Sequence, residues 1–349
     1  MIEMQGEAVT KIQETTKKHP LWRKRWIIII TLLVMTVCVL FYGLVAGSLS
    51  FSLKEMMVGI GDETTTVHRI VWDLRIPRVL VGFLVGMCLA ASGALLQGVM
   101  RNPLADPGII GVSSGAGFVA IIIMILFPMH MAFLPLGAFL GAFVTAMIIY
   151  ALSWKNGASP SRIVLVGVSI NALIGAATSA LMLLHSDKVQ SVLPWLAGGI
   201  GGVSWPHFEM VVYYAIFALV LAIVGIKHIR VLMLGDEMAK LLGHHVERSR
   251  FFLIIVSTLL AGIAVSVSGL IGFVGLVVPH MLRLLVGNDY RYLLPLSCLG
   301  GGVLVVFADA IARSWFDPIE LPVGILLSFL GGPFFLYLIH RGGKENAYR

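Results

Sequence analysis

Long hydrophobic runs separated by short polar segments make up most of the chain. A helix needs about 20 apolar residues to cross the hydrocarbon core of a bilayer, and most of these runs reach that length. They predict an all-α polytopic membrane protein whose ten transmembrane helices lie at residues 26–46, 79–100, 109–127, 132–153, 161–184, 207–226, 251–269, 275–286, 292–312 and 322–340.

Two of the predicted helices have unusual features. The eighth, at 275–286, is too short for a full crossing and follows the glycine-rich segment Gly269–Gly275, so we expect a half-helix after a break. The second, at 79–100, is rich in small residues and is followed by a turn that contains two prolines, Asn102–Gly108. Small residues let membrane helices approach each other closely, so this helix is expected inside the bundle.

The composition places the chain in the same class. Hydrophobic residues make up 58% and charged residues 12% of the sequence, whereas a soluble domain has about 25% charged residues. The membrane domain is expected to cover residues 26–341, between a cytoplasmic N-terminal extension of 1–25 and a cytoplasmic tail of 342–349. The first apolar run exceeds the short core of a cleavable signal peptide, so it is interpreted as a membrane helix.

The formal net charge of +7 does not indicate nucleic-acid binding, because the Lys and Arg residues follow a membrane topology. If the N-terminus is cytoplasmic, the inner segments of the ten-helix arrangement hold nineteen Lys and Arg, and the outer segments hold six. Cytoplasmic loops are enriched in these residues, and an odd number of helices would spoil the bias. The pattern predicts that both termini are cytoplasmic.

Three of the six outer basic residues are arginines close to predicted helix ends, namely Arg75, Arg78 and Arg313. Arginine offers a planar fork that binds carboxylates in a bidentate manner. These residues therefore fit sockets for acidic residues of an extracellular partner. Contacts with lipid phosphates, or local pairs with Asp73, Asp317 and Glu320, are the alternatives that the sequence leaves open.

An inner segment at about 235–243 is predicted to form a short helix. Acidic residues suit its start, and Gly243 suits its end. Met238, Leu241 and Leu242 recur at helical spacing, so they form one apolar face. That face suits either a helix resting on the bilayer or a helix presented to a cytoplasmic partner.

The sequence lacks the signatures of self-contained energy coupling or enzymatic catalysis. It contains no phosphate-binding G-x-x-x-x-G-K-[ST] motif and no H-E-x-x-H motif, and its three cysteines match no zinc spacing and suit small buried side chains. Polar residues within the apolar runs are few, with Gln97, Asn171 and Asp309 the clearest, and Asp309 is spaced to pair with Arg313. A proton-coupled carrier would need several carboxylates at midplane. We therefore expect no cofactor and no metal site, and an ion-coupled carrier or a membrane enzyme is disfavoured.

The segments together resemble the iron-siderophore, haem and vitamin B12 permease family of binding-protein-dependent ABC importers, over roughly residues 70–341. The motifs that carry the resemblance are Arg75–Arg78 (RIPR), Gly93–Gln97 (GALLQ), Asn102–Pro107 (NPLADP), Gly108–Gly117 (GIIGVSSGAG), Gly235–Ala239 (GDEMA) with Leu242-Gly243, Gly269–His280 (GLIGFVGLVVPH), Ala308-Asp309 with Arg313, and Glu320–Gly324 (ELPVG).

The resemblance implies a type II ABC importer permease fold of ten helices, with the second helix threaded through the middle. It implies four kinds of partner: a second permease subunit, identical or homologous, two cytoplasmic ATPase subunits, an extracytoplasmic solute-binding protein, and membrane lipids. Arg75, Arg78 and Arg313 match the family's docking arginines. The segment with Asp236, Glu237, Met238, Ala239, Leu241, Leu242 and Gly243 matches the helix that couples to the ATPases.

The expected function is that of the transmembrane permease subunit of an importer for a ferric siderophore in the bacterial cytoplasmic membrane. Haem and cobalamin are the alternative substrates, and a secondary transporter is the alternative of another class. ATP hydrolysis is expected on the partner subunits, so the chain itself is not an enzyme. The residues expected to line the path are Gln97, Ser113, Ser114 and Asn171.

Overall fold

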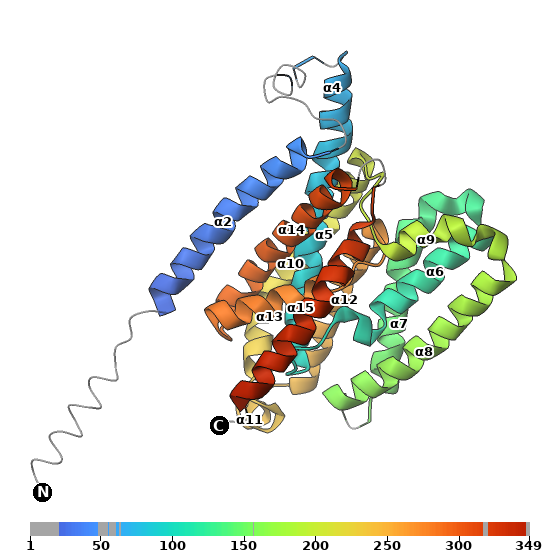
Figure 1. Ribbon diagram of the computed structural model, residues 1–349. Coiled ribbons are helices and arrows are strands. Elements are labelled where there is room, and N and C mark those ends of the chain that lie inside the picture. The colour runs from blue at the N-terminus through green and yellow to red at the C-terminus, as the bar shows by residue number, and fades with distance from the viewer. Residues whose placement is uncertain are drawn as a thin grey trace, which may run out of the picture.

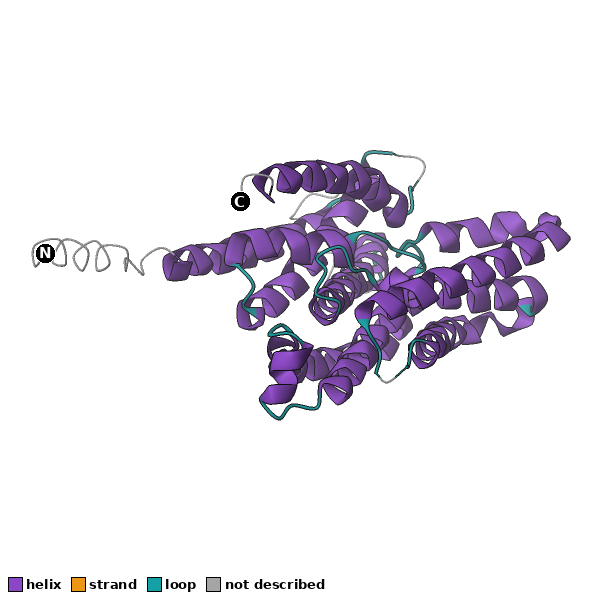
Figure 2. Ribbon diagram, turned by 90° about the horizontal axis from the view of Figure 1, so that it is seen from below, coloured by secondary structure: helices purple, strands orange, loops and turns teal. Residues whose placement is uncertain are grey.

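The computed structural model describes residues 21–47, 55, 61, 62, 64–155, 157–316 and 320–346. Within these residues it consists of helices joined by loops, and it has one isolated β-bridge between Trp154 and Ala158 (Figure 2). Ten apolar helices account for most of it: α2 (Leu21–Val45), α5 (Ile76–Val99), α6 (Val112–Leu126), α7 (Leu134–Leu152), α8 (Pro160–Leu184), α10 (Trp205–Leu232), α12 (Val246–Ser268), α13 (Val274–Val286), α14 (Tyr290–Ser314) and α15 (Val323–Asn346).

These ten helices follow the predicted spans in order. Seven of the helical stretches in the described residues are long and apolar enough to cross a membrane, and the apolar parts of α6, α13 and α15 are shorter. The all-α membrane fold predicted from the sequence is therefore confirmed. The polar segments between them contain shorter helical pieces: α4 (Thr66–His68), η1 (Arg69–Arg75), η2 (Pro107–Ile110), η3 (Pro128–Phe133), η4 (Ser186–Lys188), α9 (Val189–Ala197) and α11 (Asp236–Leu241).

Helix α5 lies in the middle of the bundle and packs against α10, α12, α13 and α14 (Figure 1). Its glycines make this possible. A Cβ atom on Gly86 would overlap the carbonyl of Gly301 in α14, and one on Gly93 would overlap the carbonyl of Gly275 in α13. The backbones touch at these two points, as expected for small residues at the contacts of membrane helices.

A buried pair of serines fixes α5 to α12. The Ser92 hydroxyl donates to the Ser257 carbonyl at 2.8 Å, and the Ser257 hydroxyl donates to the Ser92 carbonyl at 3.1 Å. Both side chains are fully buried. In hydrocarbon, where water is absent, such reciprocal bonds satisfy polar groups that would otherwise be costly.

The second helix begins earlier than predicted. The sequence places its start at 79, but the helix runs without interruption from Thr66 through α4 and η1 into α5. The segment Arg69–Arg75 has π-helical hydrogen bonding. Pro77 lies just after this π-helical segment, and the helix continues past it into α5. The extension projects beyond the rest of the bundle (Figure 1).

The break before the predicted half-helix is present. Helix α12 ends at Ser268, and α13 begins at Val274 and has only 13 residues. Between them, Gly269 and Phe273 adopt positive φ values of 62° and 67°. A positive φ costs glycine little free energy but strains phenylalanine. The conformation of Phe273 is therefore maintained by the packing around the turn.

Helix α9 was not predicted, although Val189, Val192 and Leu196 follow a helical period. Its end meets the break after α12 and the start of α15. The Gly199 amide donates to the Ser268 carbonyl at 2.7 Å, and the Gly324 amide donates to the Gly198 carbonyl at 2.9 Å. The end of α9 is thus fixed by backbone bonds both to the end of α12 and to the start of α15.

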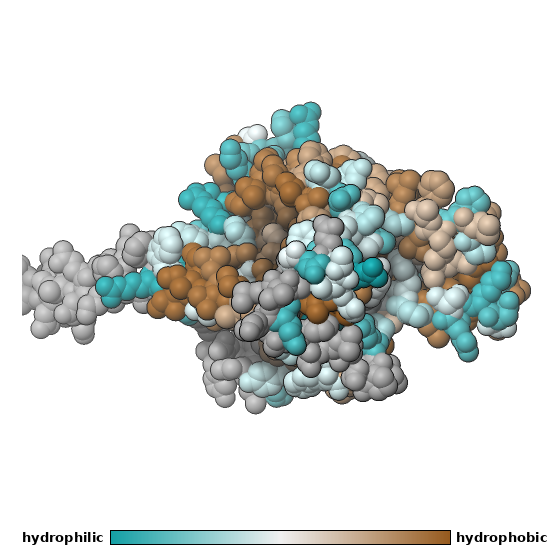
Figure 3. All heavy atoms as spheres, turned by 90° about the horizontal axis from the view of Figure 1, so that it is seen from above, coloured by the Kyte–Doolittle hydropathy of each residue, from teal (hydrophilic) through white to brown (hydrophobic). Residues whose placement is uncertain are grey.

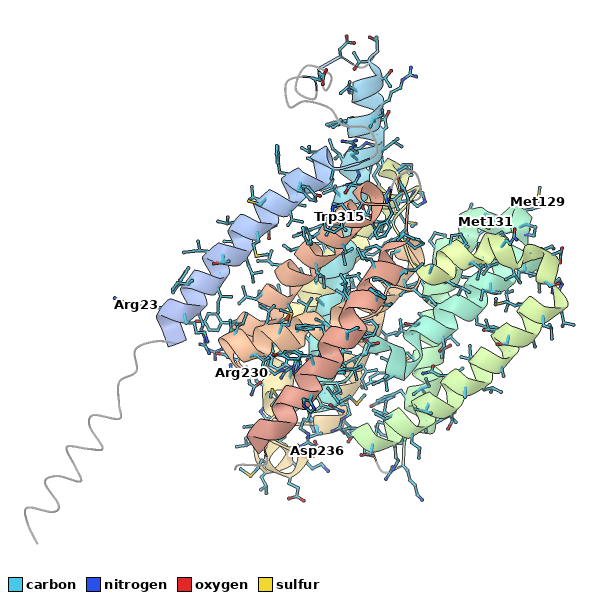
Figure 4. All side chains as sticks on the ribbon, viewed as in Figure 1. Arg23, Met129, Met131, Arg230, Asp236 and Trp315 are labelled. Carbon is cyan, nitrogen blue, oxygen red and sulfur yellow. The ribbon has the colours of Figure 1, made fainter. Side chains whose placement is uncertain are left out.

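The two ends of the bundle are called here the α4 end and the α11 end, after the elements that project there (Figure 1). Asp236 lies at the α11 end and Trp315 at the α4 end, as Figure 4 shows. The predicted inner and outer segments that contain them are thus on opposite sides. Seen from the α4 end, hydrophilic residues lie near the centre with hydrophobic residues beside them (Figure 3).

Helices α2 and α8 bury little of their apolar surface within this chain. Cys88 and Cys298 are buried, as the sequence predicts, but Cys38 on α2 is exposed, so that part of the prediction is wrong. The reason is that α2 lies at the edge of the bundle, where a small apolar side chain faces outward as easily as inward (Figure 1).

Candidate docking and coupling sites

At the α4 end, Arg78 of α5 binds two carboxylates. Its Nε and Nη2 atoms donate to Asp309 of α14 at 3.0 and 2.9 Å, and its Nη1 atom donates to Glu320 at 2.9 Å. Asp309 is buried, whereas the Glu320 side chain is 52% exposed. We call Arg75, Arg78, Asp309, Arg313 and Glu320 the arginine cluster.

Arg75 and Arg313 hold the end of α2. Arg75 Nη1 donates to the carbonyls of Leu44 and Val45, both at 2.9 Å, and Arg313 Nη2 donates to the carbonyl of Gly43. The last carbonyls of a helix have no partner within the helix and carry partial negative charge. Two guanidinium groups therefore provide hydrogen bonds to the last carbonyls of α2, a helix that buries little of its apolar surface in this chain.

The structure therefore places Arg75 and Arg313 differently from the predicted sockets. Each is only 5% exposed, because its guanidinium is turned toward α2 and, for Arg313, also toward Asp309 at 3.5 Å. The predicted pair of Asp309 and Arg313 is present. Of the alternatives left open by the sequence, the pair with Glu320 is present for Arg78, whereas Asp317 lies outside the described residues.

A cavity of about 370 Å³ adjoins the arginine cluster. Arg78, Asp309 and Glu320 form its polar wall, and Trp195 and Gly199, from α9 and the turn after it, contribute to the opposite side. A side chain entering from the α4 end thus has room to reach the guanidinium of Arg78.

At the α11 end, the predicted short helix is present as α11, with Gly235 before it and Leu242 after it. Ala239 is buried against the bundle. Met238, Leu241 and Leu242 point away from it, and Leu241 is 80% exposed. Two exposed apolar side chains on this six-residue helix, with a third directly after it, form a surface that suits burial against another protein.

Arg250 holds α11 in place. This arginine, 1% exposed, donates from Nη2 to Asp236 at 2.8 Å and from Nη1 to Glu247 at 3.0 Å and to the Ala158 carbonyl at 2.7 Å. It thereby joins α11, the start of α12 and the connection between α7 and α8. Asp236 also pairs with Arg101, at 3.4 Å, in the turn after α5.

Two of the four predicted path residues come together. The Ser114 hydroxyl donates to the Asn171 side-chain oxygen, and the Asn171 amide donates to the Gly108 carbonyl at 3.0 Å. Both side chains are partly buried at the contact of α6 with α8. They hold the start of α6 against α8, which is itself mostly exposed within this chain.

Gln97 lies elsewhere, within the bundle. It is 1% exposed, its amide donates to the carbonyls of Gly275 and Leu276, and its oxygen accepts from Arg283 at 3.0 Å. Arg283 also donates to Tyr290, whose hydroxyl donates to the Ala94 carbonyl. Gln97 is thus part of a joint between α5, α13 and α14, and in this conformation it does not line an open space.

Ser113, the fourth predicted path residue, faces a small internal cavity shared with Asp106 and Gly275. The Asp106 side chain accepts from the Gly108 amide at 2.8 Å and caps η2. Burial raises the pKa of the Asp106 carboxyl, and the hydrogen bond from Gly108 opposes that rise. Among the described residues, no three His, Cys, Asp or Glu side chains gather as metal ligands.

Comparison with known proteins gives a consistent result. The model of the FecCD transport family matches residues 32–341. The "Probable siderophore transport system permease protein YfhA" of Bacillus subtilis is 36% identical over 91% of this chain and 96% of its own length. The "Hemin transport system permease protein HmuU" of Yersinia pestis is 39% identical over 86% of this chain and 91% of its own length.

A solved structure extends the likeness to three dimensions. A metal-chelate type ABC transporter in an inward-facing conformation superposes with a TM-score of 0.81, at 30% identity, over 90% of this chain and 99% of the matched chain. The ten-helix arrangement is therefore that of an ABC transporter permease.

Proposed function

The chain belongs to the FecCD transport family of ABC importer permeases, and from this premise we propose that it carries ferric siderophores across the bacterial cytoplasmic membrane. The full-length likeness to a relative named as a siderophore permease supports this substrate class. Haem is the second candidate, supported by the similarly extensive likeness to the hemin permease. Cobalamin remains the third, on the breadth of the family.

The observation that carries the rest of the proposal is the pair of surfaces at opposite ends of the bundle. The exposed apolar face of α11 binds a cytoplasmic ATPase subunit, one for each of two permease subunits. The arginine cluster receives an extracytoplasmic solute-binding protein. Arg78 makes the direct contact, because its Nη1 atom lies beside the exposed carboxylate of Glu320 and is therefore close to the surface. Both termini are then cytoplasmic.

The structure suggests how motion passes from one surface to the path. Closure of the ATPases on ATP moves α11, and Arg250 and the Asp236–Arg101 pair carry that movement into α12 and the turn after α5. That turn leads to η2 and α6, where Ser114 and Asn171 meet. The path runs beside these two residues, against a second permease subunit, and the binding protein supplies the substrate selection.

The substrate proposal is tested by purifying the complete importer from its host and identifying what its solute-binding protein retains. We expect a ferric siderophore, recognised by its charge-transfer absorption and by mass spectrometry. Retained haem or a corrinoid would replace the siderophore as substrate but leave the permease role intact.

The docking proposal is tested by Arg78→Gln. Removing a charge from a close interfacial pair commonly costs tenfold or more in affinity, so binding of the solute-binding protein to the importer in lipid nanodiscs is expected to weaken by about tenfold. Arg69→Gln is the matched control, because it removes the same charge from the exposed part of the same long helix. Equal affinities of the two variants would remove Arg78 from the docking site.

A further inference from the structure

We propose that Glu320 acts as an internal substitute for the partner's carboxylate: it occupies the free edge of Arg78 until the solute-binding protein replaces it. The proposal rests on the docking function proposed above and adds a competitor within the chain. Its basis is the division of the Arg78 guanidinium between two carboxylates that differ in burial.

Asp309 is the permanent partner of Arg78. It binds the Nε and Nη2 edge in a bidentate manner, it is 3% exposed, and it also pairs with Arg313. Removing a buried carboxylate from two arginines would leave uncompensated charge in the bundle, which is costly. This edge of the fork is therefore not available to a partner.

The Nη1 atom of Arg78 is the side that a partner can reach. It donates to Glu320 at 2.9 Å, and Glu320 is more than half exposed and lies in the segment before α15. Water competes for the charge of Glu320, so this half-exposed pair contributes less free energy than the buried pair with Asp309. Glu320 is thus held weakly enough to be displaced, whereas Asp309 is not.

Occupancy of the Arg78 guanidinium favours exchange over addition. Its Nε and Nη2 atoms already donate to Asp309, and its Nη1 atom already donates to Glu320. A third carboxylate on the same guanidinium would bring like charges within contact distance of Glu320, which is unfavourable. An incoming carboxylate that takes the place of Glu320 keeps both the charge and the hydrogen bond at Nη1.

The cavity beside the cluster gives the partner's side chain access. It measures about 370 Å³ and is lined by Arg78 and Glu320 on one side and by the end of α9 on the other. Because the occupant must carry a carboxylate on a flexible arm, the structure points to a glutamate or aspartate of the docked protein.

Displacement of Glu320 would also remove one of the bonds that hold the segment before α15. Glu320 is followed by Leu321 and Pro322, and the Gly324 amide bonds to the end of α9 at 2.9 Å. The Arg78–Glu320 pair therefore ties the start of α15 to α5. Docking releases that tie at the moment at which the partner binds.

Glu320→Gln tests the proposal directly, with the importer in lipid nanodiscs and its purified solute-binding protein as the probe. Loss of the competing pair between Arg78 and Glu320 predicts an affinity about two- to fivefold higher than that of the unmodified protein. Glu209→Gln, which removes an exposed carboxylate from the first turns of α10, is the matched control and is expected to change little. The gain is expected to vanish in the double variant Arg78→Gln/Glu320→Gln.

The outcomes separate this proposal from the docking proposal. If Arg78→Gln weakens docking and Glu320→Gln leaves it unchanged or weakens it, the docking site stands and the internal competitor is wrong. If Arg78→Gln has no effect, the docking site itself is wrong, and the exchange at Arg78 fails with it. A gain with Glu320→Gln that persists in the double variant would also overturn the exchange, because it would not depend on Arg78.

Discussion

Replacement of Arg250 by alanine is expected to lower the free energy of unfolding by about 3 kcal/mol and to uncouple ATP hydrolysis from transport. The substitution removes a side chain that joins α11, α12 and the connection before α8. It leaves Glu247 and the Ala158 carbonyl without their cation, and it leaves Asp236 with only the longer pair to Arg101. This loss of stability lies at the lower end of the range for broken buried ion pairs, because the side chains of Asp236 and Glu247 are each about a third exposed to solvent.

Thermal unfolding of the solubilised permease measures the first effect, and the ratio of substrate transported to ATP hydrolysed in vesicles measures the second. Arg248→Ala is the matched control, because that arginine is exposed two positions away on the same helix. A variant with the stability and transport ratio of the control would show that α11 is held by other contacts. Arg250→Lys is expected to keep the positive charge but lose some of the three hydrogen bonds. Its stability and transport ratio should therefore lie between those of Arg250→Ala and Arg248→Ala.

The double substitution Met238→Asp/Leu242→Asp is expected to release the ATPase subunits. Both side chains are exposed and apolar, and burying a carboxylate in their place opposes association. Buried anchor residues of an interface each commonly contribute about 2 kcal/mol, so the pair predicts at least 100-fold weaker binding. Co-purification of the ATPases with the tagged permease is the measurement.

The double variant Met238→Leu/Leu242→Met provides the control, because it keeps apolar side chains of similar volume and should retain the ATPases. Retention of the ATPases by the aspartate variant as well would favour the alternative, in which α11 rests on the bilayer surface. In that case the aspartates would change membrane association of the free permease without changing assembly.

The apolar runs predict the helices well because burial in lipid demands both length and continuous hydrophobicity. The break before α13 was also predictable, since Gly269 permits the positive φ that ends α12, whereas the positive φ of Phe273 was not. The early start of the second helix was not predictable, because the apolar residues before Ile76 are interrupted by charged ones and form no continuous apolar run. Their helix is held by its continuation into α5.

The arginine cluster shows where sequence reasoning ends. Sequence position alone makes Arg75, Arg78 and Arg313 equivalent, whereas the fold turns two of them onto the carbonyls that end α2. The partner of a long flexible side chain depends on which backbone lies within its reach, and that is a property of packing between helices far apart in the sequence. Arg78, in contrast, is bound to an exposed carboxylate, that of Glu320.

Arg250 and Glu320 were not predicted as functional residues. Arg250 is one of five basic residues in a predicted cytoplasmic segment, and nothing in its local sequence distinguishes it from exposed Arg248. Its burial arises because α11 folds back on the start of α12. Gln97 shows the opposite case, since its polar side chain in an apolar run suggests a path, yet its hydrogen bonds are all internal to the bundle.

The central claim is that this chain is a passive conduit, whose energy source and substrate selector bind at its two ends. Vesicles containing the permease alone, the permease with its ATPases, or the full set with the solute-binding protein test it directly with a radiolabelled ferric siderophore. ATP-dependent accumulation only with the full set is the predicted result. Accumulation against a gradient by the permease alone would contradict the claim.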